Sequence, residues 1–110
     1  GQDILLEIDC QGAKQIQQIL PGSIGIFILP PSASTLATRL KTRAQDNPGI
    51  IEKRLVAARE EVGHITEFDY VIINDKLEDA LNDLICIVRA EHLKKARQLI
   101  KYHELIAQLS

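Results

Sequence analysis

The chain has 110 residues, a formal net charge of −2 at pH 7, and 45% hydrophobic and 25% charged residues. This length supports one domain with one core, and the composition excludes a disordered chain. The small net charge argues against a general nucleic-acid or membrane-surface binder, so any positive field must be local. No apolar run approaches the roughly 20 residues of a membrane span.

The first 30 residues predict two strands and one helix. Ile4–Asp9 and Ile24–Leu29 are short apolar runs rich in branched residues, and 70–73 is a third run of this kind. Continuous rather than alternating apolarity is typical of strands that are covered on both faces, as in a parallel sheet. Between the first two runs, an apolar stripe with helical spacing ends at Pro21-Gly22.

Three further helices are expected along the rest of the chain. Pro30-Pro31 precedes a helix that Ser32 or Ser34 can cap. A third apolar stripe runs over 51–65, and the loop-like segment 44–49 separates these two helices. Asp75 with Glu78 forms a capping-box-like start for a C-terminal helix over about 76–109.

The order of these elements predicts the fold class. Strands that alternate with helices imply an α/β fold, a layered parallel sheet with flanking helices and right-handed crossovers. Three strands make a thin sheet for this layout, so the fold is expected to be incomplete in this chain. The sequence also contains no methionine. We therefore expect that an N-terminal portion of the protein has been removed, although a trimmed methionine or an engineered start gives the same pattern.

Cys10 and Cys86 form neither a CxxC pair nor a disulfide framework. We interpret each as a buried free thiol, in keeping with a reducing compartment such as the cytoplasm.

Cationic residues gather around the polar bend of 44–49. Arg39 and Arg43 share a helix face because they lie four residues apart, and Arg54 follows the bend. One interpretation is a solvated helix surface, since most exposed charges contribute little. The other is an anion clamp, because guanidinium groups form bidentate bonds with phosphate and offset charge on a transferred phosphoryl group.

Acidic and amide side chains follow two of the predicted strands. Glu7 and Asp9 point to one side of the first strand, at its C-terminal end, where open α/β sheets bind ligands. Asp9 either caps the next helix or takes part in magnesium binding or base recognition. Asn74 and Asp75 follow the third strand. Asn74 offers the paired donor and acceptor that suit a base edge, whereas Asp75 is interpreted as a helix cap.

Five segments resemble the guanylate kinase family, in the order found there: "GQDILLEIDCQGA", "IFILPPS", "RLKTRAQDNPGIIEKRL", "EFDYVIIND" and "IVRAEHL". The resemblance implies a P-loop NTPase fold of the nucleoside monophosphate kinase type, of which residues 1–110 would be the C-terminal part of a bacterial-type enzyme. It implies transfer of a phosphoryl group from ATP to GMP with Mg²⁺ in purine nucleotide metabolism. Residues of about 41–53 would form the mobile lid.

The resemblance also implies roles for individual residues. Arg39, Arg43 and Arg54 would contact phosphates and be catalytic, with Arg39 and Arg43 also binding ATP. Glu7 and Asp9 would bind GMP, with either of them near magnesium, and Asn74 would lie on the adenine side.

The sequence departs from the family pattern in three ways. Ala44 stands where the family has glycine, so lid hinging could differ, and Cys10 replaces a larger apolar residue. The P-loop motif G-x-x-x-x-G-K-[ST] is absent, so the phosphate cradle must lie in a missing N-terminal segment. In the family, the strand that bears this loop lies between the strands matching 4–9 and 24–29. This chain alone is therefore expected to be inactive.

Two alternatives stay open at this stage. One is a guanylate-kinase-like protein-interaction domain without catalysis, although retention of the arginines favours the enzyme. The other concerns the C-terminal apolar stripe that ends at Leu109, which would pack on the body of the protein or on a second subunit of a homo-oligomer.

Overall fold

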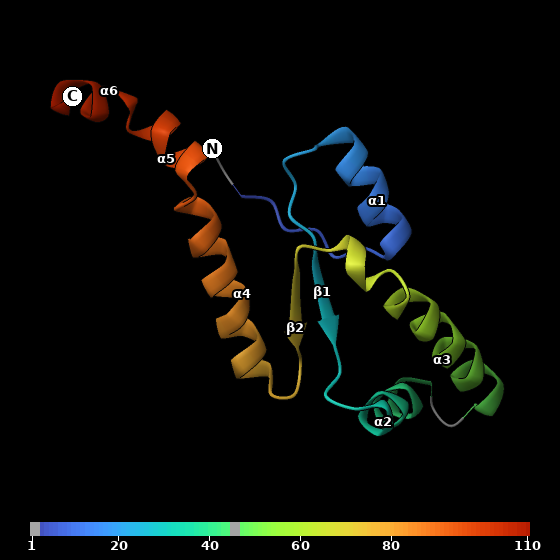
Figure 1. Cartoon of the computed structure of the whole chain (residues 1–110). Coiled ribbons are helices and arrows are strands. Elements are labelled where there is room, and N and C mark those ends of the chain that lie inside the picture. Colours follow the sequence, from blue (N-terminus) through green and yellow to red (C-terminus); the bar gives the residue numbers. More distant parts are fainter. Residues whose placement is uncertain (1–2, 45–46) are drawn as a thin grey trace. The chain divides into compact units, whose positions relative to one another are not determined.

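The computed structural model describes residues 3–44 and 47–110, with the side chains of Arg43 and Ala44 outside this description. The chain divides into two compact units, 1–73 and 74–110. The helices and strands labelled in Figure 1 are α1 (Cys10–Ile19), β1 (Ile26–Leu29), α2 (Ala33–Ala44), α3 (Pro48–Val62), β2 (Tyr70–Ile73), α4 (Leu77–His92), α5 (Lys95–Lys101) and α6 (His103–Leu109). A short 3₁₀ helix, η1 (Ile65–Glu67), lies between α3 and β2.

The two strands confirm the predicted parallel pairing. β1 pairs with β2 from Ile26 opposite Tyr70 to Leu29 opposite Ile73. Asp69 closes the amino end of this ladder, because its carboxylate accepts from the Gly25 amide at 2.8 Å while its own amide donates to the Gly25 carbonyl at 2.8 Å. The helices α2 and α3 connect the strands, as a parallel pair requires a long crossover. The described residues therefore form a mixed helix and strand structure with a small parallel sheet.

The predicted first strand is wrong for the described chain. Residues 4–9 belong to no strand, and their large apolar side chains are exposed, with Ile4 at 84% and Leu5 at 73% of full exposure. A strand requires a neighbouring backbone that satisfies its amide and carbonyl groups. The apolar run has the composition of a strand, but no described segment supplies this hydrogen-bonding partner.

Side-chain caps fix the starts of three helices. The Asp9 carboxylate accepts from the Gly12 amide at 2.7 Å at the start of α1, and the Ser32 hydroxyl accepts from the Thr35 amide at 3.1 Å before α2. Asn47 caps α3 and Pro48 occupies its first turn, where a missing amide hydrogen costs nothing. These caps confirm Ser32 as the second helix's start and agree with the cap interpretation of Asp9.

The second unit contains three helices where one was predicted. α4 ends at His92, and α5 and α6 are separated at Tyr102 by a backbone conformation with φ −113° and ψ 26°. Asp75 lies one residue before the N-cap position of α4, which Lys76 occupies without a side-chain cap bond. Neither break between these helices contains proline or glycine, and the apolar residues keep their helical spacing across both. The sequence pattern therefore predicted one continuous helix.

Few apolar side chains are buried in the described residues. Ile72 at 3% exposure lies in β2, and Ala80 and Ile87 lie seven residues apart on α4, hence on one face. The prediction that both thiols are buried is wrong for Cys86, which is exposed, whereas Cys10 is half-buried. Among the described residues, no helix combines the length and the apolar character needed to cross a membrane.

Candidate functional site

The helices α2 and α3, which flank the bend, carry the predicted arginines and pack against each other. Arg39 lies in the second turn of α2, and Arg54 lies in the second turn of α3. Both side chains are exposed. Arg43 belongs to α2, but its side chain lies outside the described part, so its role remains a prediction. The structure thus confirms that two helices carry these residues to either side of one short connection.

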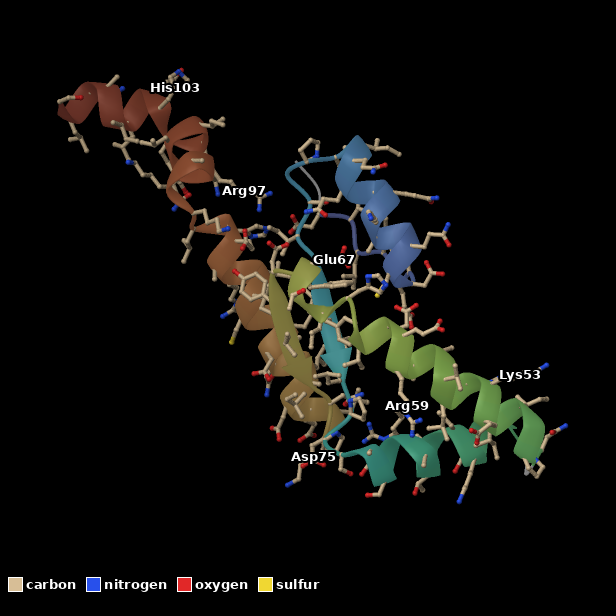
Figure 2. All side chains as sticks on the ribbon, turned by 45° about the vertical axis from the view of Figure 1, so that its right-hand side comes forward. Lys53, Arg59, Glu67, Asp75, Arg97 and His103 are labelled. Atoms are coloured by element: carbon tan, nitrogen blue, oxygen red, sulfur yellow. The ribbon has the colours of Figure 1, made fainter. Side chains whose placement is uncertain are left out.

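The side chain of Arg54 forms no ion pair or hydrogen bond within residues 3–44 and 47–110. Figure 2 shows its neighbour Lys53 extending away from α3, and Arg59 extending from another side of the same helix. An α-helix turns by about 100° per residue, so these three cations project in different directions. These three side chains of α3 therefore cannot all contact one ligand.

Two polypeptide segments leave the carboxyl edge of the sheet. Leu29 ends β1 and pairs with Ile73, which ends β2. The chain continues from Leu29 through two prolines into α2, and from Ile73 directly into Asn74. Asn74 begins the second unit, so its place relative to α2 and its predicted role stay a prediction. Ligands of open α/β sheets bind at this edge.

The acidic pair of the N-terminal segment lies on exposed backbone. Glu7 and Asp9 are exposed and form no ion pair with any described residue. Asp9 uses one carboxylate oxygen, Oδ1, for the Gly12 amide. A carboxylate has two oxygens that accept hydrogen bonds, so capping α1 leaves Oδ2 for a ligand donor. The two interpretations of Asp9 are thus compatible with each other.

A contact between α1 and α3 was missed by the sequence reasoning. The Cys10 amide donates to Glu61 Oε2 at 3.1 Å, and the Cys10 thiol donates to the Glu61 carbonyl oxygen at 3.7 Å. Two adjacent glutamates, Glu60 and Glu61, are by sequence most simply interpreted as a solvated helix face, but Glu61 is half-buried. The partners are 51 positions apart in the sequence, and no local pattern reports so distant a contact.

This contact perturbs the thiol. Partial burial and the hydrogen bond and negative charge of Glu61 raise the pKa of Cys10 to about 12 from an ordinary 9.0. Burial, the hydrogen bond and the negative charge all disfavour the thiolate, so Cys10 is a poor candidate for a nucleophile.

The contact also locates the Asp9 turn along α3. Glu61 lies seven residues after Arg54, a separation of about 10 Å along a helix that brings both residues to the same face. Asp9 therefore lies at the far end of α3 from the bend, rather than beside the arginines. Its predicted convergence with them on one ligand stays a prediction.

A cleft of about 270 Å³ opens beside this contact. It is lined by Cys10, Gln11, Lys14, Glu60, Glu61, His64 and Glu67. His64 Nδ1 lies 2.6 Å from Glu67 Oε2, so these two side chains satisfy each other. The cleft is smaller than the usual 300–1,000 Å³ of a ligand pocket and is open to solvent, so we do not assign a nucleotide to it.

Among the described residues, no three His, Cys, Asp or Glu side chains are arranged to hold a metal ion. The predicted magnesium donors, Glu7 and Asp9, therefore do not form a metal centre by themselves.

Parallel strands with a helical crossover, and exposed arginines on that crossover, define an α/β domain suited to an anionic ligand. A family model described as guanylate kinase matches residues 1–91, and the chain belongs to this family. The family implies a P-loop NTPase fold, and the small sheet agrees with an incomplete domain.

Curated relatives carry the same description. A guanylate kinase of Nitrosospira multiformis is 56% identical over 110 residues, which are 100% of this chain and 52% of the relative. Guanylate kinases of Nitrosomonas europaea and Methylobacillus flagellatus are 53% and 51% identical, each over 99% of this chain and 54% of the relative. The chain thus spans about half the length of the curated relatives it matches.

Proposed function

We propose that residues 1–110 form the C-terminal part of a guanylate kinase domain that transfers the γ-phosphoryl group of ATP to GMP. The observation that carries this proposal is the family match over residues 1–91, which includes both arginine-bearing helices and the Asp9 turn. Identities of 51–56% to proteins named guanylate kinase support the same activity. We place the enzyme in the cytoplasm, and no observation in the described residues favours a non-catalytic interaction domain.

The arginines have the chemistry that phosphoryl transfer needs. In the reaction, an oxygen of the GMP phosphate attacks the γ-phosphorus of ATP, and the bond to the leaving ADP oxygen breaks. Negative charge spreads over the transferred group in the transition state. Arg39 and Arg54 lie on two contacting helices, and guanidinium groups form bidentate bonds with phosphate oxygens. With Arg43, they would bind the phosphates and offset this charge when the lid of about 41–53 closes.

The remaining site residues would bind the nucleoside parts. Asp9 has one carboxylate oxygen beyond its cap, and a carboxylate can accept from the N–H groups of guanine. Glu7 would support GMP from the same exposed segment. Asn74 follows β2 at the carboxyl edge and would lie on the adenine side.

Magnesium is expected as the partner of the ATP phosphates. Mg²⁺ commonly uses one or two protein carboxylates together with water and substrate phosphates. The described residues supply no self-contained magnesium centre, and the cap bond already occupies one oxygen of Asp9.

The test is turnover of the protein completed to the full length of its relatives. We expect formation of GDP and ADP from GMP and ATP, and a fall in kcat of about 10²–10³-fold for Arg54→Ala, as for loss of one donor to a transition-state charge. Lys53→Ala is the matched control, because Lys53 is the adjacent cation and extends away from α3 (Figure 2); it should change kcat by less than about threefold. Absence of GDP formation by the completed wild-type protein contradicts the proposal.

A further inference from the structure

We infer that Glu61 is a positioning residue for GMP, which holds the Asp9 turn against the helix that carries Arg54. This inference rests on the proposed function, since it assigns a consequence to the place of Asp9 in GMP binding. Glu61 itself touches no substrate in this account. It acts through Cys10, the residue bonded to Asp9.

The geometry of the α1 start supports this role. The first amide groups of a helix have no carbonyl partner within the helix. Asp9 satisfies the Gly12 amide at 2.7 Å from within its own turn. Glu61 satisfies the Cys10 amide at 3.1 Å from α3, so a second carboxylate fixes the same turn from outside. Hydrogen bonds of charged acceptors are stronger than neutral ones, and negative charge is favoured at a helix N-terminus.

The backbone of Asp9 cannot move far without breaking this contact. The Cα atoms of Asp9 and Cys10 are separated by one peptide unit, about 3.8 Å. The hydrogen bond of the Cys10 thiol to the Glu61 carbonyl adds a second point of attachment. The N-terminal segment before Asp9 belongs to no strand, so strand pairing does not restrain the turn. The long-range hydrogen bond between the Cys10 amide and Glu61 restrains it instead.

Glu61 and Arg54 also share one face of α3, because they lie seven residues apart. A rigid helix of this length sets a spacing of about 10 Å between the two positions. Glu61 at one position holds the turn that would bind the base of GMP. Arg54 at the other would bind a phosphate. α3 thereby links the two ends of the proposed GMP site.

The adjacent carboxylate provides a matched control. Glu60 is exposed and lines the same cleft, but its side chain forms no hydrogen bond with any described residue. A substitution there removes the same charge from the same helix without removing the contact with Cys10. His64 and Glu67 pair with each other and do not replace Glu61 as the acceptor.

The kinetic experiment compares Glu61→Ala, Glu61→Gln and Glu60→Ala in the completed full-length protein. We expect Glu61→Ala to raise the KM for GMP about tenfold, with kcat and the KM for ATP within about threefold of the parent. Glu61→Gln should restore the KM for GMP to within about threefold, because its amide oxygen still accepts from the Cys10 amide. Glu60→Ala should leave both KM values unchanged. An unchanged KM for GMP in Glu61→Ala, or an equal rise in Glu60→Ala, overturns the inference.

A shorter side chain covers the case in which Glu61→Ala fails to fold. Glu61→Asp keeps the charge but loses one methylene of reach, so it should also raise the KM for GMP. A parent-like KM for GMP in Glu61→Asp overturns the inference in the same way.

A second readout separates the contact from the proposed function. In a Cys86→Ser background, Cys10 should react faster with iodoacetamide after Glu61→Ala than in the parent, because the neighbouring charge that disfavours its thiolate is gone. An unchanged alkylation rate contradicts the contact. Faster alkylation without any GDP formation by the wild-type protein would confirm the contact and overturn both the proposed function and the role of Glu61 in GMP binding.

Discussion

Asn47→Ala should destabilise the protein by about 1 kcal/mol through the first turn of α3. Asn47 Oδ1 accepts from the Gly49 amide at 3.1 Å and from the Ile50 amide at 3.3 Å. Loss of such a cap costs about 0.5–2 kcal/mol. Both hydrogen bonds are exposed and the second is long, so water replaces part of the loss and a value near the middle of that range applies. One kcal/mol lowers the folding equilibrium constant about fivefold.

Denaturant unfolding of the completed full-length protein measures this effect. The midpoint should shift while the m value stays constant, because the folded structure and its buried surface are unchanged. Asn47→Gly is the matched control, since glycine at an N-cap costs only a few tenths of a kcal/mol. Equal stability of Asn47→Ala and the parent, or an equal loss in Asn47→Gly, would refute the cap as the source of stability at the bend.

Three further outcomes follow from the described residues. Because the pKa of Cys10 is raised to about 12, its alkylation should stay slow at pH 8 and accelerate toward pH 12, and rapid alkylation at pH 8 would contradict this prediction. The unfolded chain loses the thiol proton at a lower pH than the folded chain, so the free energy of unfolding should fall as the pH rises above about 9. Ile72→Ala should cost about 2–5 kcal/mol in denaturant unfolding, whereas Ile100→Ala, at 79% exposure, should cost less than about 0.5 kcal/mol; similar losses would count against the assigned core. The 110-residue chain alone should show no phosphoryl transfer in an assay of GDP formation, because it contains no P-loop motif. Turnover of this chain equal to that of the full-length protein would contradict the prediction.

Local patterns predicted the elements whose structure depends on local interactions. The β2 strand, the end of α1 at Pro21-Gly22 and the cap at Ser32 were all recognisable, since turn and cap chemistry acts over a few residues. The family resemblance was also correct, because several co-linear segments carried it.

Features that depend on distant partners were not predictable. The segment before Asp9 has the composition of a strand, but strand formation requires a pairing backbone that the described chain does not supply. Glu61 had the sequence pattern of a solvated face, and its contact with Cys10 spans 51 residues. The breaks between the C-terminal helices lack glycine and proline, so sequence gave no signal of them.

The central claim is that Arg39 and Arg54 act on the same transferred phosphoryl group, and a double-mutant cycle on kcat tests it most directly. In the completed protein, Arg39→Ala and Arg54→Ala should each lower kcat by about 10²-fold or more. Residues that act as one unit are non-additive, so the double variant should lose much less than the product of the single losses. A double loss equal to that product, or a parent-like kcat in either single variant, would contradict the claim.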